Sequence, residues 1–176
     1  MKRLLRLTGI LSLILWCWIC AWFTIFARET SAQPQIELRL FWCIREAWTM
    51  RNTFDWYLVV GNILLFIPLG FILSTCFESM RKSWKIILSS FIFSLMIELL
   101  QLMLHRGLFE LDDLFNNTLG GILGYGITII FMDVKERGNI SFEDKTLTMV
   151  LWILVMIFVM IALLTGQPVF DFFRII

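Results

Sequence analysis

Long apolar runs, separated by short polar connections, make up most of this chain. Five runs come close to the roughly 20 residues that a helix needs to cross a bilayer; they cover residues 7–27, 57–76, 84–104, 114–132 and 147–165. The fourth run carries four glycines, which is typical of a helix packed inside a bundle. The pattern predicts an all-α fold: a single membrane domain over residues 1–176 with about five transmembrane helices.

Two segments each allow two interpretations. Residues 30–32 resemble a signal-peptide cleavage site, but the run before them is longer than the usual signal core of about 7–15 residues, which favours a retained helix. In the loop formed by residues 28–56, apolar residues recur at helical spacing between Ile36 and Trp48. This spacing favours a short amphipathic helix on the outer surface, and an irregular loop that caps the bundle is nearly as compatible with it.

The composition excludes a soluble enzyme with one large core. Hydrophobic residues make up 59% of the chain and charged residues 16%, against roughly 45–50% and about 25% in soluble domains. The net charge is +1 and no basic cluster stands out. Nothing therefore points to a nucleic-acid partner.

The basic residues indicate an orientation. Nine of the 15 precede the first run or lie in alternate connections, namely Lys2, Arg3, Arg6, Arg81, Lys82, Lys85, Lys135, Arg137 and Lys145. Short cytoplasmic connections carry the excess of Lys and Arg in membrane proteins. We therefore expect the amino terminus inside and the carboxyl terminus outside.

Polar residues gather within and just after the third run. Glu98 lies inside the apolar run, and Gln101 follows on the same helical face. A charged side chain at the bilayer centre costs roughly 2.5–3.5 kcal/mol on insertion scales and usually faces the bundle interior with a functional role. The candidate site at the outer end of the bundle comprises Asn62, Glu98, Gln101, Arg106, Asp112, Asp113 and Asn117.

Each of these residues also has a structural explanation. Asp112 and Asp113 at the start of a helix favour its dipole and cap it, at about 0.5–2 kcal/mol, and for these two alone capping is the stronger interpretation. Asn62 and Gln101 are explained equally as interhelical hydrogen-bond partners at about 0.6 kcal/mol each. Arg106 is explained as the ion-pair partner of an acidic neighbour. Taken together, the set favours a polar site over a purely structural role.

Other motifs point to packing rather than to chemistry. The candidate helix-packing residues are Pro68, Gly70, Gly120 and Gly124. Cys17 and Cys20 have redox spacing, but the hydrocarbon around them disfavours a thiolate, so we expect packing cysteines. A single histidine leaves no histidine-rich metal site. We predict no cofactor and no resident metal.

The order of these motifs resembles the VanZ-like family of bacterial membrane proteins. The resemblance covers roughly residues 36–130 and rests on GNILLFIPLG at 61–70, IELLQ at 97–101, Arg106, ELDD at 110–113 and NTLG at 117–120. The chain departs from the family pattern at Leu40, where Pro is expected, and at Glu110, where Asp is expected. The resemblance implies a multi-pass protein of the bacterial plasma membrane. The family's named member is associated with teicoplanin resistance, although membership of a family does not fix the function of each member.

Three hypotheses follow for the polar site. The preferred one is a non-enzymatic envelope protein that contributes to teicoplanin resistance by binding a lipid-linked cell-wall precursor, a lipid headgroup or the lipoglycopeptide, with Arg106 on a phosphate or carboxylate. The second is a membrane-embedded enzyme on a lipid-linked substrate, with Glu98 as acid or base and Asp112 and Asp113 around a divalent cation. The third is a structural or assembly protein without a ligand. The lipid bilayer is a partner in all three.

Overall fold

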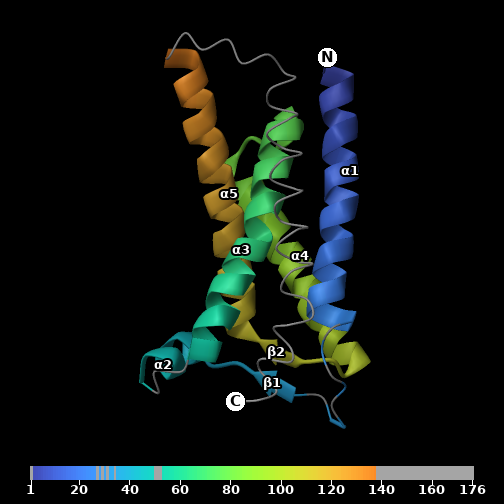
Figure 1. The fold of residues 1–176 in the computed structure, drawn as a ribbon, viewed down its shortest axis with the longest axis vertical. Coiled ribbons are helices and arrows are strands. Elements are labelled where there is room, and N and C mark those ends of the chain that lie inside the picture. The colour runs from blue at the N-terminus through green and yellow to red at the C-terminus, as the bar shows by residue number, and fades with distance from the viewer. Residues whose placement is uncertain are drawn as a thin grey trace.

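Four long helices form the body of the described part of the molecule. The computed structural model describes residues 2–26, 28, 30, 32–33, 35–49 and 53–137. The long helices are α1 (Lys2–Ala21), continued by the π-helical turn η1 (Trp22–Phe26), then α3 (Thr53–Cys76), α4 (Ser83–Leu104) and α5 (Leu111–Arg137) (Figure 1). A 3-10 turn, η2 (Glu78–Met80), precedes α4. Within the described residues, four segments are long and apolar enough to cross a membrane: Arg3–Phe26, Leu58–Cys76, Ser83–Leu104 and Leu111–Met132.

These four segments correspond to the first four apolar runs. Several helices extend beyond the runs, because hydrophobicity marks only the part of a helix that lies among lipid tails. Helix α3 begins at Thr53 rather than at residue 57, and α5 begins at Leu111, so that Asp112 and Asp113 lie in its first turn. The fifth predicted helix, residues 147–165, lies outside the described residues.

Helix α3 packs closely on α5 because glycines line their crossing. A Cβ atom on Gly70 would collide with the carbonyl oxygen of Gly121 on α5. A Cβ atom on Gly120 or Gly124 would collide in the same way with carbonyl oxygens of α3. Small residues allow the backbones of membrane helices to approach this closely. The fourth candidate packing residue, Pro68, lies inside α3, where it removes one helical N–H donor.

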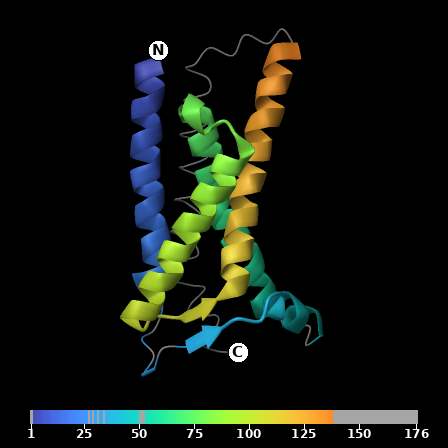
Figure 2. The same ribbon diagram turned by 180° about the vertical axis from the view of Figure 1, so that it is seen from behind.

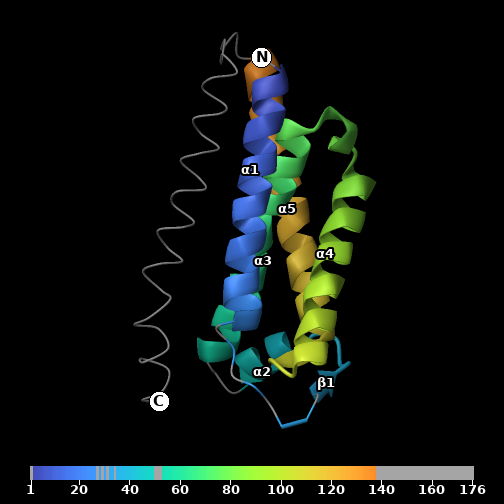
Figure 3. The same cartoon turned by 90° about the vertical axis from the view of Figure 1, so that its right-hand side faces the viewer.

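Trp16 joins α1 to the other helices. Its side chain is buried, and its indole Nε1 donates a hydrogen bond to the carbonyl oxygen of Leu65 at 2.8 Å. Its ring packs edge-on against Phe66 of α3 and Phe93 of α4. Such aromatic pairs contribute about 0.5–1.5 kcal/mol beyond the area they bury. Helix α1 consequently runs alongside α3 (Figure 3).

A two-stranded parallel ladder closes one end of the bundle, which we call the ladder end. Strand β1 (Gln35–Glu37) pairs with β2 (Leu108–Glu110), and the short helix α2 (Trp42–Thr49) follows β1 (Figure 2). The fold is mostly helical as predicted, but the all-α expectation misses this ladder. The expected amphipathic helix exists only from Trp42, because Ile36 is drawn into a strand by its pairing with Phe109. Spacing over a few residues does not separate helix from strand.

The two ends of the bundle differ in the charge they carry. The amino terminus, the α3–α4 connection and the last turns of α5 lie at the end opposite the ladder (Figure 1). That end carries Lys2, Arg3, Arg6, Arg81, Lys82, Lys85, Lys135 and Arg137. The buried acidic residues Glu98, Asp112 and Asp113 lie toward the ladder end, because Glu98 bonds to the backbone of β2 and α5 begins directly after β2.

Candidate functional site

Helix α4 turns a polar face toward the other helices. Its buried residues include Ser90, Ser94, Glu98 and Gln101, which recur at helical spacing, whereas its exposed residues include apolar side chains such as Met96. A membrane helix of this kind presents its apolar side to lipid and keeps its polar side inside the bundle. The polar side of α4 supplies three of the side chains of the site described below.

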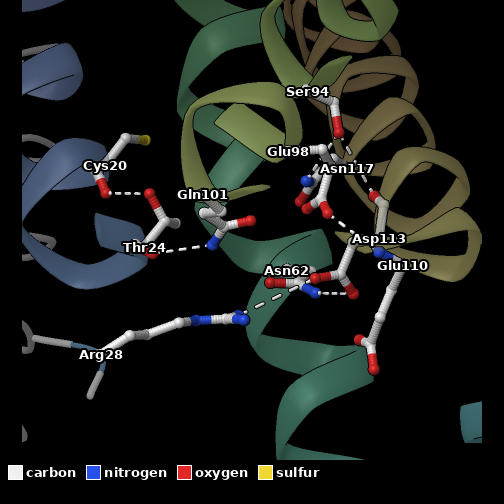
Figure 4. A network of polar contacts seen from close by, with 10 residues as sticks. All are labelled: Cys20, Thr24, Arg28, Asn62, Ser94, Glu98, Gln101, Glu110, Asp113 and Asn117. Carbon is white, nitrogen blue, oxygen red and sulfur yellow. Dashed lines mark hydrogen bonds and ion pairs between the residues drawn. The ribbon is translucent and has the colours of Figure 1, made fainter. Parts of the chain in front are cut away.

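Eight side chains form what we call the acidic cluster (Figure 4). They come from α3, α4, β2, α5 and the segment after η1, and they are Arg28, Asn62, Ser94, Glu98, Gln101, Glu110, Asp113 and Asn117. Five of the seven sequence candidates are among them. The other two, Arg106 and Asp112, lie nearby and contact different groups.

Glu98 links α4 to the ladder. Its side chain is 1% exposed, and its Oε2 accepts a hydrogen bond from the backbone N–H of Glu110 at 2.9 Å. A buried carboxylate needs such donors to offset the loss of water. The connection between α4 and α5 thereby folds back over the carboxylate, which places Glu98 and Glu110 in one environment.

Asp113 is the centre of the contacts between α3, α4 and α5. Its carboxylate accepts a hydrogen bond from Nδ2 of Asn62 and lies 3.9 Å from Nη2 of Arg28. The hydroxyl of Ser94 approaches its backbone carbonyl at 3.5 Å, and Nδ2 of Asn117 donates to that hydroxyl oxygen at 2.9 Å. Asp113 is thus more than a helix cap, because side chains from both neighbouring helices converge on it.

Glu110 lies outside the membrane-spanning segments, at the entrance to α5. Burial raises the pKa of its carboxyl group to about 8, and the negative charge of Asp113 acts in the same direction. The guanidinium of Arg28 opposes this shift only in part. A carboxyl group with this pKa takes up and releases a proton near neutral pH.

Arg106 and Asp112 fasten the segments around the cluster. The Arg106 guanidinium donates to the carbonyl oxygens of Ile25 and Phe26, at 3.4 and 3.1 Å. Both carbonyl oxygens lie at the end of η1, and the ion pair with an acidic neighbour stays a prediction. The Asp112 carboxylate accepts the backbone N–H of Phe41 and so ties the first loop to α5.

Sequence reasoning missed Arg28, Ser94 and Glu110 as members of the site. Ser94 had a usable signal, since it lies one helical turn before Glu98. Arg28 had none, because it belongs to a different connection and reaches the site only in the folded chain. Gly107 makes room for it: its φ of 95° is a conformation that favours glycine, and a Cβ atom there would lie 2.8 Å from Nη1 of Arg28.

The fold and the site define a multi-pass helical membrane protein with buried carboxylates near one end. A family model described as VanZ/LLP1 matches residues 9–132, a range that contains the whole acidic cluster. The chain therefore belongs to the VanZ/LLP1 family, as the motifs indicated. No curated protein and no solved structure matches it.

Proposed function

We propose that this VanZ/LLP1-family protein acts in the bacterial plasma membrane and contributes to teicoplanin resistance. Its acidic cluster would bind a lipid-linked wall precursor, a lipid headgroup or the lipoglycopeptide at the outer membrane face. The observation that carries the proposal is the burial of Glu98 and Asp113, 1% and 4% exposed, beside several amide and hydroxyl groups. A carboxylate that lies within a membrane-spanning segment and faces the bundle interior usually has a functional role.

The distribution of basic residues supports an outer location for the cluster. The end opposite the ladder carries the basic residues of the amino terminus and the α3–α4 connection. Because the positive-inside rule assigns such connections to the cytoplasm, the ladder end would face outward. Lipid-anchored intermediates and amphiphilic antibiotics would meet the protein at that level. We further propose a topology of five helices, in which the predicted helix over residues 147–165 is the last and the carboxyl terminus lies outside.

A second candidate function is catalysis on a lipid-linked envelope substrate. The raised pKa of Glu110, about 8, favours it, because an acid–base group works best when its pKa lies near the ambient pH. Purified protein would then consume a lipid-linked precursor, and Glu110→Gln would abolish that turnover. Binding without turnover would reject the catalytic function and retain the binding one.

The direct test is antibiotic susceptibility in a Gram-positive host with and without this chain. We expect a higher minimum inhibitory concentration of teicoplanin with the intact protein, and its return to the level of the empty host with Glu98→Gln or Asp113→Asn. Both substitutions preserve side-chain volume and remove the carboxylate charge. Membrane abundance must be measured alongside, because a folding defect would give the same loss.

Glu37→Gln provides the matched control. Glu37 is also an acid at the ladder end, but its partner is Arg39, whose guanidinium Nε donates to it at 2.8 Å, outside the acidic cluster. This variant should confer the same resistance as the wild type. An unchanged teicoplanin susceptibility with the abundant intact protein would reject the role in resistance.

A further inference from the structure

Two buried amide oxygens of the acidic cluster have no hydrogen-bond donor among the described residues. Gln101 donates through Nε2 to the carbonyl oxygen of Thr24 at 2.7 Å, but its Oε1 has no donor within the described part of the chain, although the side chain is 1% exposed. Figure 4 shows this oxygen turned away from Thr24 and toward Glu98. The Oδ1 of Asn117, 3% exposed, likewise has no donor among the described residues. Unpaired buried acceptors each cost free energy that a donor would recover.

The charges of the cluster also favour a ligand that donates hydrogen bonds and carries a positive charge. The carboxyl groups of Glu98, Glu110 and Asp113 interact electrostatically with one another and with Arg28. Arg28 is the cation common to all three, yet its closest approach to Asp113 is 3.9 Å and its side chain is 26% exposed. With a pKa of about 8, Glu110 is largely protonated at neutral pH, so the one loosely held guanidinium faces the two carboxylates of Glu98 and Asp113. The cluster therefore favours a further positive charge and disfavours an anion.

The unpaired acceptors and the excess of negative charge together indicate what kind of ligand the cluster would bind. Within the described ranges, no group of three or more His, Cys, Asp or Glu side chains is arranged to hold a metal ion. The acceptors are instead spread over amide and carboxylate oxygens of α4 and α5. A compact cation with several N–H donors suits this arrangement, since an ammonium group carries three donors and no acceptor.

We propose that the acidic cluster binds a primary ammonium group through Glu98, Gln101, Asp113 and Asn117, in competition with the guanidinium of Arg28. This inference rests on the proposed function, to which it adds the chemistry of the ligand. The ammonium group belongs either to a lipid headgroup, such as phosphatidylethanolamine, or to a soluble amine. It enters where Arg28 and Glu110 are partly exposed, at the end of the bundle where lipid headgroups lie.

The test compares ligands that differ only in their N–H donors. The full-length protein is purified in detergent, and native mass spectrometry measures the binding of phosphatidylethanolamine and of its trimethylated analogue phosphatidylcholine. Hydrogen bonds to charged groups are strong, and a trimethylammonium group has no N–H with which to donate them. We therefore expect phosphatidylethanolamine to bind about tenfold more tightly than phosphatidylcholine. Equal binding of the two lipids would overturn the inference.

A competition experiment separates the two sources of the amine. Ethanolamine that displaces bound phosphatidylethanolamine, where choline does not, would identify a site for soluble amines as well. Failure of both to displace the lipid would identify the headgroup of an intact lipid as the ligand. Either result agrees with ammonium recognition, provided that the lipid preference is present.

Substitutions in the cluster should change the binding affinity in opposite directions for a cationic and for an anionic ligand. Glu98→Gln and Asp113→Asn should weaken phosphatidylethanolamine binding about tenfold, whereas Arg28→Ala should strengthen it severalfold because the competing cation is lost. Arg28→Gln, which keeps a polar side chain, replaces Arg28→Ala if the latter does not accumulate. Glu37→Gln should bind like the wild type.

The failures of the two proposals are distinguishable. Preference for phosphatidylglycerol, with loss of binding in Arg28→Ala, would show an anion site; the ammonium inference would fall and the proposed binding function would stand. If susceptibility to teicoplanin does not depend on Glu98 and Asp113, the resistance role fails whatever the amine measurements show.

Discussion

At the scale of single residues, the environment of Glu110 has a consequence for stability. Its pKa is raised to about 8 in the folded protein by burial and by the charge of Asp113, whereas an unfolded chain leaves a glutamate near its usual value of about 4.3. The folded state therefore binds the proton more tightly. The contribution of this group to stability is complete below the unfolded pKa and is lost as the pH rises through the folded pKa.

We expect the melting temperature of the purified protein to fall as the pH rises between about 4.3 and about 8. In Glu110→Gln this fall should be smaller, and the variant should exceed the wild type in melting temperature above pH 8. Circular dichroism during thermal unfolding in detergent measures both. A pH profile identical to that of the wild type would contradict the prediction.

Glu37 supplies the control for this titration. Hydrogen bonds from Arg39 lower the pKa of Glu37 to about 2, so its contribution is present above the unfolded pKa and is lost as the pH falls through the folded one. Between about pH 4.5 and 8 it is constant. Glu37→Gln should therefore leave the slope in that range unchanged.

At the scale of helices and strands, the close crossing of α3 and α5, which we call the seam, explains the glycines of the fourth apolar run. Because a Cβ atom on Gly124 would collide with backbone atoms of α3, we expect Gly124→Ala to destabilise the protein by about 1–3 kcal/mol, the usual cost of overpacking. Gly70→Ala should behave alike, since its Cβ atom would meet the carbonyl oxygen of Gly121. Unfolding in increasing concentrations of sodium dodecyl sulfate reports the change.

Gly126 is the internal control on the same helix. Nothing lies within 4 Å of a Cβ atom added there, and alanine is favoured over glycine inside helices by up to about 1 kcal/mol. Gly126→Ala should therefore be neutral or slightly stabilising. Equal destabilisation by Gly124→Ala and Gly126→Ala would mean that the seam does not depend on close backbone contact.

These elements also show how far the sequence predicts the structure. The apolar runs correctly predicted four candidate membrane-spanning helices. The bilayer sets the length of such a helix, so a single continuous stretch of sequence is enough to identify it. The β1–β2 ladder was not predictable, because it joins residues 35–37 to residues 108–110 through backbone bonds that no side-chain pattern encodes. Glu98 was identified because its cost in hydrocarbon makes it conspicuous. Arg28 was missed because an arginine in a connecting loop is common, and its proximity to Asp113 arises only from the tertiary fold.

At the scale of the whole molecule, the topology decides which leaflet the acidic cluster meets. The four described spans alternate in direction, so the α3–α4 connection and the α4–α5 connection lie at opposite ends (Figure 1). Reporter proteins fused after residue 80 and after residue 107 should therefore be assigned to opposite sides. We expect the first inside and the second outside, because basic residues flank the first connection.

Fusions near the carboxyl end extend the same experiment to the predicted fifth helix. A reporter after residue 137 should lie inside, and one after Ile176 should lie outside if residues 147–165 cross the membrane. An inside position for both would reject the fifth span and leave the four described helices unaffected. A reversed result at residues 80 and 107 would instead place the acidic cluster at the cytoplasmic leaflet. Wall precursors and antibiotics presented from outside would then be the wrong ligands, whereas an amine-bearing headgroup, which both leaflets can supply, would still fit the cluster.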